Sequence, residues 1–162
     1  MKWITHQCMA VMAAMALDMP VTGIAAAWIG SVFPDMLDRK KAGASFFRQW
    51  KFNSVHRKGS HWFGWWLLLW LFSYAGMLGP LPDSIAGGFA FGALTHVLLD
   101  MCTIRGVPML PEGGKNFSLR ICRTGGLGEY AILALSMALF WLAFLGDADF
   151  SGMLRSAGIL VP

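Results

Sequence analysis

Three apolar stretches of this chain are long enough to cross a lipid bilayer, and they constrain its fold more than any other feature. They cover residues 61–79, 84–103 and 129–146, and a helix of about 20 residues spans a hydrocarbon core of roughly 30 Å. Backbone groups in the bilayer core must pair within their own segment, so such stretches form helices. The proline-containing residues 80–83 separate the first two stretches, which predicts an antiparallel hairpin.

The N-terminal apolar region is interrupted and allows two arrangements. Residues 7–17 and 21–33 are apolar, and Asp18, Met19 and Pro20 separate them. At 1.5 Å per residue each piece is only about 16–20 Å long. One arrangement is a single kinked span with a buried Asp18. The other is a re-entrant hairpin of two half-helices, which we favour because it returns the chain to the side from which it started.

Composition and charge indicate an integral membrane protein of one domain, residues 1–162. Hydrophobic residues make up 56% of the chain and charged residues 14%, against about 25% charged in soluble domains. Of the thirteen Lys and Arg residues, seven lie in residues 34–60 and four in residues 104–128. The positive-inside rule places both loops in the cytoplasm and residues 147–162 in the periplasm. We read the basic loops as contacts to anionic lipid and expect no nucleic-acid partner.

The predicted fold is therefore all-α. It is a polytopic membrane helical bundle with three full spans, preceded by a broken helix or re-entrant helical hairpin at residues 7–33.

Histidine and aspartate residues lie at the edges of the apolar stretches. Ionisable groups at a membrane are costly and mark functional sites. His96 and Asp100 are four residues apart, on one face of a helix, where two ligands can bind one ion; the alternative is a capping aspartate and an interfacial histidine. His56 and His61 flank a turn at Gly59 that can bring both imidazoles together, unless the segment is only a solvated basic loop.

Two further residues complete the predicted site. Asp35 follows Pro34 at the end of an apolar run, and the hairpin would bring His6 beside it. Imidazole and carboxylate are ligands of zinc and related divalent metals. The sequence thus predicts a metal centre with one or two divalent ions, zinc being the favoured metal. Its candidate ligands are His6, Asp35, His56, His61, His96 and Asp100.

Other residues suggest catalytic roles. Arg57 has the forked guanidinium that matches two phosphate oxygens. Asp38 or Glu129 would be the general base, although Glu129 opens the last apolar stretch and could equally cap that helix. Thr103 and Thr124 would donate hydrogen bonds to a bound oxyanion.

Read in order, these segments resemble the LexA-regulated, inner-membrane-bound family of predicted metal-dependent hydrolases in bacteria. The resemblance covers about residues 1–130 and implies a bacterial inner-membrane hydrolase. The order of histidine, aspartate, histidine, HxxxD and glutamate is also similar to the ligand order of zinc-dependent phospholipase C. This chain lacks the further HxxxH segment of those enzymes, which implies one or two metals. The matching segments are Thr5-His6, residues 30–38, 56–61, 92–100 and 103–111, and residues 124–126 before Glu129.

We expect a membrane-bound, metal-dependent hydrolase of a phosphoester, such as a phospholipid headgroup, with its site facing the cytoplasm of a bacterial inner membrane. Its partners would be membrane lipids and this substrate. The sequence is also compatible with a homodimer. One alternative is a small metal or proton transporter, since broken helices and intramembrane ionisable residues are transporter features. The other is a non-catalytic membrane protein with a structural metal, for which a closed ligand shell would be evidence.

Overall fold

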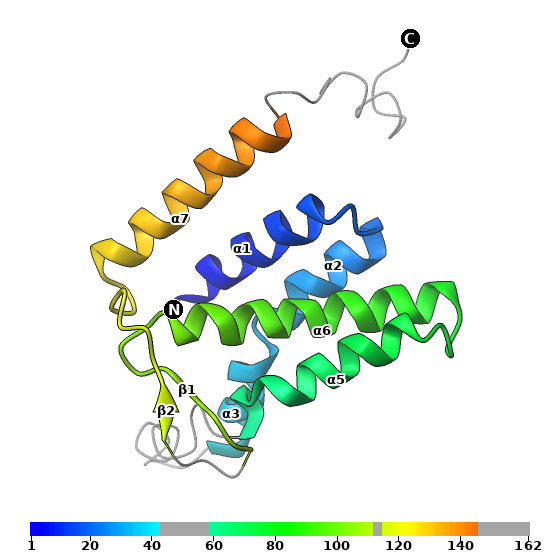
Figure 1. The fold of residues 1–162 in the computed structure, drawn as a ribbon, viewed down its shortest axis with the longest axis horizontal. Helices are drawn as coiled ribbons and strands as arrows, with labels where there is room; N and C mark the ends of the chain where they lie inside the picture. Colours follow the sequence, from blue (N-terminus) through cyan, green and yellow to red (C-terminus); the bar gives the residue numbers. More distant parts are fainter. Residues whose placement is uncertain (43–58, 112–114, 146–162) are drawn as a thin grey trace.

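The computed structural model describes residues 1–42, 59–111 and 115–145, and its fold is predominantly helical (Figure 1). The chain forms helices α1 (Trp3–Ala16), α2 (Val21–Gly30), α3 (Phe33–Ala42), α5 (Phe63–Tyr74), α6 (Pro80–Met101) and α7 (Leu127–Phe140). The shorter elements are a 3-10 turn η1 (Gly59–His61), a π-helical turn η2 (Trp141–Leu145) and the strands β1 (Val107–Pro108) and β2 (Asn116–Phe117).

Helix α6 is the centre of the bundle and contacts α1, α2 and α5. Helices α1 and α2 run antiparallel, as do α5 and α6 (Figure 1). The N-terminal region therefore has the hairpin arrangement rather than that of a single kinked helix. Helix α2 returns the chain to the side where α1 starts, and α3 follows there. Helix α7 packs on α1 (Figure 1). The re-entrant position of the hairpin in a bilayer remains a prediction.

Small residues let α2 and α6 approach each other closely. A side-chain carbon at Gly88 would overlap the backbone of Gly23, and one at Gly92 would overlap the backbone of Ala27. On the α2 side, a side-chain carbon at Gly30 would overlap the backbone of Phe89. Such contacts between small residues are common where membrane helices pack. They set the distance between α2 and α6, the helix that carries His96 and Asp100.

One helix of the described residues, α6, is long and apolar enough to cross a membrane by length and composition. Helices α5 and α7 are apolar but shorter. The helix expected over residues 61–79 ends at Tyr74, and Gly76 and Gly79, which follow it, have positive φ angles of 67° and 96°. Such angles suit glycine and do not continue a helix. The architecture of three full spans therefore stays a prediction.

Both loops expected to be cytoplasmic contain regular structure. Residues 33–42, expected as the end of an apolar run and the start of a loop, form α3, whose first turn contains Pro34 and Asp35. Proline and an acidic residue both suit the first turn of a helix. Strands β1 and β2 pair antiparallel within the second loop. The predictions for His56, Arg57 and residues 147–162 lie outside the described residues.

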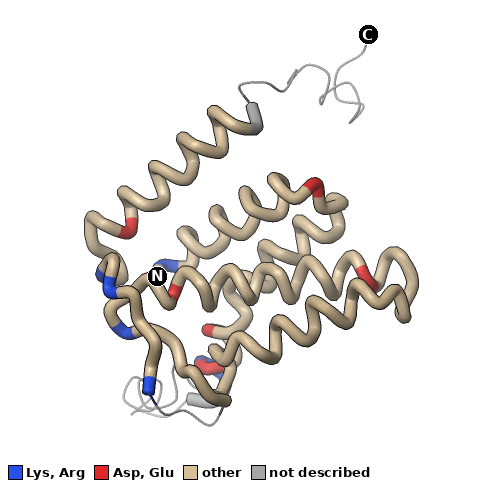
Figure 2. Tube along the Cα trace, viewed as in Figure 1, with Lys and Arg blue, Asp and Glu red and all other residues tan. Residues whose placement is uncertain are grey.

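Charge is distributed unevenly along the bundle (Figure 2). The basic residues that the structure describes gather at the end where the N-terminus and β1–β2 lie. Asp18, in the turn between α1 and α2, and Asp83, in the first turn of α6, lie at the opposite end. This asymmetry is the one on which the predicted orientation depends, with the basic end toward the cytoplasm.

Candidate metal centre

Five of the six predicted metal ligands come together at the basic end of the bundle. Separate elements supply them, namely α1, α3, η1 and α6, and each of the five is buried. Each of the five residues exposes less than one tenth of its surface. The sixth predicted ligand, His56, is outside the described residues. The five are His6, Asp35, His61, His96 and Asp100.

Four donor atoms, which we call the inner cluster, have nearly equal separations. The Nε2 atoms of His61 and His96 are 3.2 Å apart. Asp35 Oδ1 lies 3.4 and 3.6 Å from them, and Asp100 Oδ2 lies 3.7 Å from each. Bonds of 2.0–2.2 Å to a tetrahedral zinc ion require donor atoms about 3.3–3.6 Å apart. These five separations lie within about 0.1 Å of that range, and Asp35, His61 and His96 have donor atoms close enough to hold an ion.

The far side of each imidazole fixes which nitrogen faces the cluster. His96 Nδ1 lies 2.6 Å from the carbonyl oxygen of Ser31, which can only accept, so Nδ1 carries the proton. His61 Nδ1 lies 3.4 Å from Asp38 Oδ2 and 3.2 Å from Ser60 Oγ. Both rings thus present the Nε2 lone pair to the carboxylate oxygens of Asp35 and Asp100. Electron-rich atoms brought this close in a buried site need a proton or a metal ion between them.

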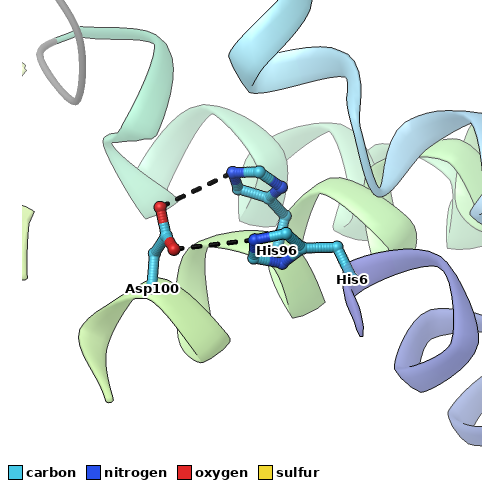
Figure 3. A group of neighbouring side chains, drawn as sticks. All are labelled: His6, His96 and Asp100. Carbon is cyan, nitrogen blue, oxygen red and sulfur yellow. Dashed lines mark ion pairs between the residues drawn. The ribbon is translucent and has the colours of Figure 1, made fainter. Parts of the chain in front are cut away.

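Asp100 also faces a second candidate position. The imidazole of His6 stacks on that of His96, with ring centroids 3.8 Å apart, and its Nε2 lies 3.6 Å from Asp100 Oδ1 (Figure 3). The α-amino group of Met1 donates to the same oxygen, at 2.6 Å. His6, His96 and Asp100 have donor atoms close enough to hold an ion. We call this the outer position, and Asp100 could bridge it to the inner cluster.

Residues that the sequence analysis missed orient the ligands. Trp3 Nε1 donates to Asp35 Oδ2 at 3.0 Å, which leaves Oδ1 for the inner cluster. The guanidinium of Arg39 lies over the Trp3 ring, 4.3 Å from its centroid. Partners of this kind fix the orientation of metal ligands. The pairing of Trp3 with Asp35 depends on how α1 packs against α3, and no short motif indicates it.

Asp38, predicted as a general base, lies behind His61 rather than in the inner cluster. Its side chain is buried and accepts a hydrogen bond from Ser60 Oγ. The position of Asp38 suits a residue that orients His61.

Glu129, the other predicted base, bonds to the start of α1 and to the loop before α7. Its Oε1 accepts hydrogen bonds from the Lys2 backbone N–H and from Thr5 Oγ1, and its Oε2 accepts one from the Gly125 N–H, each at 2.6 Å. Its side chain is fully buried. Both oxygens thus hold α1 and α7 together. This structural role is closer to the predicted helix cap than to a general base.

Glu129→Gln is expected to lower the free energy of unfolding by about 1–3 kcal/mol, because the amide nitrogen would face donors that need an acceptor. Thermal unfolding in detergent, followed by circular dichroism, measures this. Asp18→Asn is the control: Asp18 is exposed, so a change within about 0.5 kcal/mol is expected. A Glu129→Gln variant that unfolds like the wild type would contradict the structural role. The predicted role of Glu129 as a general base would then remain.

The two predicted oxyanion donors, Thr103 and Thr124, lie near Asp35. Thr103 Oγ1 donates to the backbone carbonyl of Asp100 at 2.7 Å, at the end of α6. Thr124 lines a cavity beside Asp35. Arg57 is outside the described residues.

Comparisons with known proteins identify the family. A family model described as YdjM inner membrane protein matches residues 1–153. No curated protein and no solved structure matches the chain. The family match spans the whole helical bundle and every candidate ligand, so the chain belongs to the family of the YdjM inner membrane protein.

Proposed function

We propose that this protein is a membrane-bound, metal-dependent hydrolase of a phosphoester, with its site at the cytoplasmic surface of a bacterial inner membrane. One observation carries the proposal, the convergence of His61 Nε2, His96 Nε2, Asp35 Oδ1 and Asp100 Oδ2 at separations of 3.2–3.7 Å. The family supports the membrane location, and the basic residues at this end of the bundle support the orientation.

The donor set fits a zinc-like ion. It consists of imidazole nitrogens and carboxylate oxygens, a combination typical of hydrolytic zinc sites, whereas structural zinc sites are usually rich in cysteine. The inner cluster would hold one ion, and His6 with Asp100 Oδ1 would contribute to a second. A divalent metal bound at the outer position, which has fewer protein donors than the inner cluster, would supply Lewis acidity and lower the pKa of a water molecule to about 7.

The chain's own residues prepare the site. Ser31 and Asp38 hold the two imidazoles with Nε2 inward, and Trp3 turns the Asp35 carboxylate. Burial of the ligands keeps bulk water out, which strengthens their interaction with a cation. Arg57 remains a predicted phosphate ligand. A phospholipid headgroup is the proposed substrate because a site at this membrane surface meets it at high local concentration.

A second function, a structural metal site, has one observation in its favour. The inner cluster supplies four protein donors, which is the closed shell typical of structural sites. The outer position and the cavity beside Asp35 favour the hydrolase, because they give a substrate a route to the centre.

Metal content and hydrolysis together test the proposal. Protein purified in detergent without chelator is expected to contain about one or two zinc ions per chain and to hydrolyse a phosphodiester. Chelation should abolish hydrolysis and zinc should restore it. His96→Ala should lose both zinc and activity, whereas Thr95→Ala, the adjacent residue of α6, should keep both, since its hydroxyl donates only within the helix.

Wild-type protein without metal would contradict the hydrolase and the structural site alike. Stoichiometric metal with no hydrolysis of soluble or vesicle-borne phosphoesters would favour the structural role.

A further inference from the structure

A cavity of about 400 Å³ lies beside the metal centre. Asp35, a member of the inner cluster, lines it together with Thr103, Arg105, Arg123 and Thr124. We call it the arginine pocket. Since Asp35 belongs to both, a molecule bound in this pocket would lie next to the metal centre.

Paired backbone holds the two arginines on the same wall. The segments that follow α6 and precede α7 meet in a bridge between Thr103 and Cys122, and the Ile104 N–H donates to the Cys122 carbonyl at 3.2 Å. Ser118 Oγ donates to the Thr103 carbonyl at 2.5 Å. Arg105 and Arg123 each come directly after one of these paired residues, so their backbone positions are fixed relative to each other.

The pocket carries an excess of positive charge. Both arginines are exposed, and among the residues that the structure describes neither guanidinium has an ion-pair partner. They lie in the group of basic residues at this end of the bundle (Figure 2). Two arginine side chains without an acidic partner, next to a cation site, create a positive potential that attracts an anion.

We propose that the arginine pocket binds the phosphate group of the substrate, with Arg105 and Arg123 as ligands of the phosphate oxygens. This inference rests on the proposed function and assigns the substrate subsite of that same centre. The planar guanidinium donates two parallel hydrogen bonds to a phosphate, and the Thr124 hydroxyl can add a third donor.

Neighbouring side chains favour a lipid headgroup over a soluble phosphate as the source. Ile104, Leu119 and Ile121 are 46%, 53% and 60% exposed on the segments that carry the arginines. Apolar side chains beside basic ones are typical of segments that lie at a membrane surface and contact anionic lipid. The phosphate in the pocket would then belong to a lipid held by the same surface.

Calorimetric titration of the purified, metal-analysed protein tests the subsite. Glycerol phosphate is the soluble ligand, and monomeric dihexanoyl phosphatidylglycerol is the lipid ligand. Arg105→Gln and Arg123→Gln are each expected to weaken both affinities about 10- to 100-fold, the range for one charge-assisted hydrogen bond, with unchanged metal content. Arg123→Lys should recover only part of the loss, because lysine keeps the charge but not the fork. Lys115→Gln, in the same loop but not lining the pocket, should bind like the wild type.

The outcomes separate the subsite from the hydrolase. Full metal content with equal phosphate affinity in the wild type and both arginine variants would overturn the subsite and leave the proposed function standing. Metal-free wild type whose phosphate binding still depends on both arginines would support the subsite and overturn the hydrolase. Lipid binding at least tenfold tighter than glycerol phosphate is expected, and equal affinities would overturn the lipid source.

Discussion

Asp100→Asn is expected to remove metal from both the inner cluster and the outer position, because the two oxygens of Asp100 face them separately. Oδ2 lies 3.7 Å from the Nε2 atoms of His61 and His96, and Oδ1 lies 3.6 Å from that of His6. Loss of an orienting partner typically lowers metal affinity 10- to 100-fold, and we expect the loss of this ligand to exceed about 100-fold. Elemental analysis and competition with a chelator measure it.

Two matched variants show whether the effect is specific. Asp35→Asn removes a ligand of the inner cluster only. In protein that holds two ions it should retain one, and in protein that holds one it should retain none. Asp83→Asn is the same substitution in the first turn of α6, at the opposite end of the bundle, and should keep all metal. An Asp100→Asn protein with wild-type zinc content would contradict the bridging role.

The grouping of the candidate ligands could be predicted from the sequence where their geometry is local. His96 and Asp100 share a helix face because they are four residues apart, and the structure places both in one buried cluster. His6 and Asp35 could be expected at the same end of the bundle, since two short apolar pieces that fold back return the chain to its starting side. His61 lies directly before α5, where the edge of the apolar stretch indicated it.

The residues that orient the ligands could not be predicted, because their partners are distant in sequence. The carbonyl of Ser31 that fixes His96 is a backbone atom 65 residues away, and every residue offers such an atom. The sequence favours neither the general-base nor the capping role of Glu129, because the Lys2 and Thr5 donors that occupy Oε1 lie more than 120 residues away. Only the packing of α1 against α7 brings them together.

Helix ends were predicted poorly for a different reason. Hydropathy extends the apolar stretch at residues 61–79 through Gly76 and Gly79, whose backbone angles do not continue α5. Earlier in the chain, Pro34 suggests the end of an apolar helix but occupies the first turn of α3, because proline lacks only an N–H that the first turn leaves unpaired.

Gly92→Leu is expected to destabilise the bundle by more than about 3 kcal/mol, above the 1–3 kcal/mol typical of overpacking, because even its first side-chain carbon would overlap the backbone of Ala27. Neither helix can relieve this overlap by a rotamer change, so α2 must move away from α6. Thermal unfolding in detergent measures the loss. Gly23→Ala is the control in the same interface, where the added carbon would be 3.4 Å from its nearest neighbours, and it should unfold within about 1 kcal/mol of the wild type.

The same substitution should also weaken metal binding, because the helix interface and the metal centre share an element. Ser31 follows the last residue of α2, and its carbonyl holds His96 of α6 at 2.6 Å. Displacement of α2 would break this bond and free the His96 ring to turn away from the inner cluster. We therefore expect Gly92→Leu protein that still folds at low temperature to bind zinc about 10- to 100-fold more weakly, the loss typical of a missing orienting partner. Folded Gly92→Leu protein with wild-type zinc affinity would show that the spacing of α2 and α6 does not control the centre.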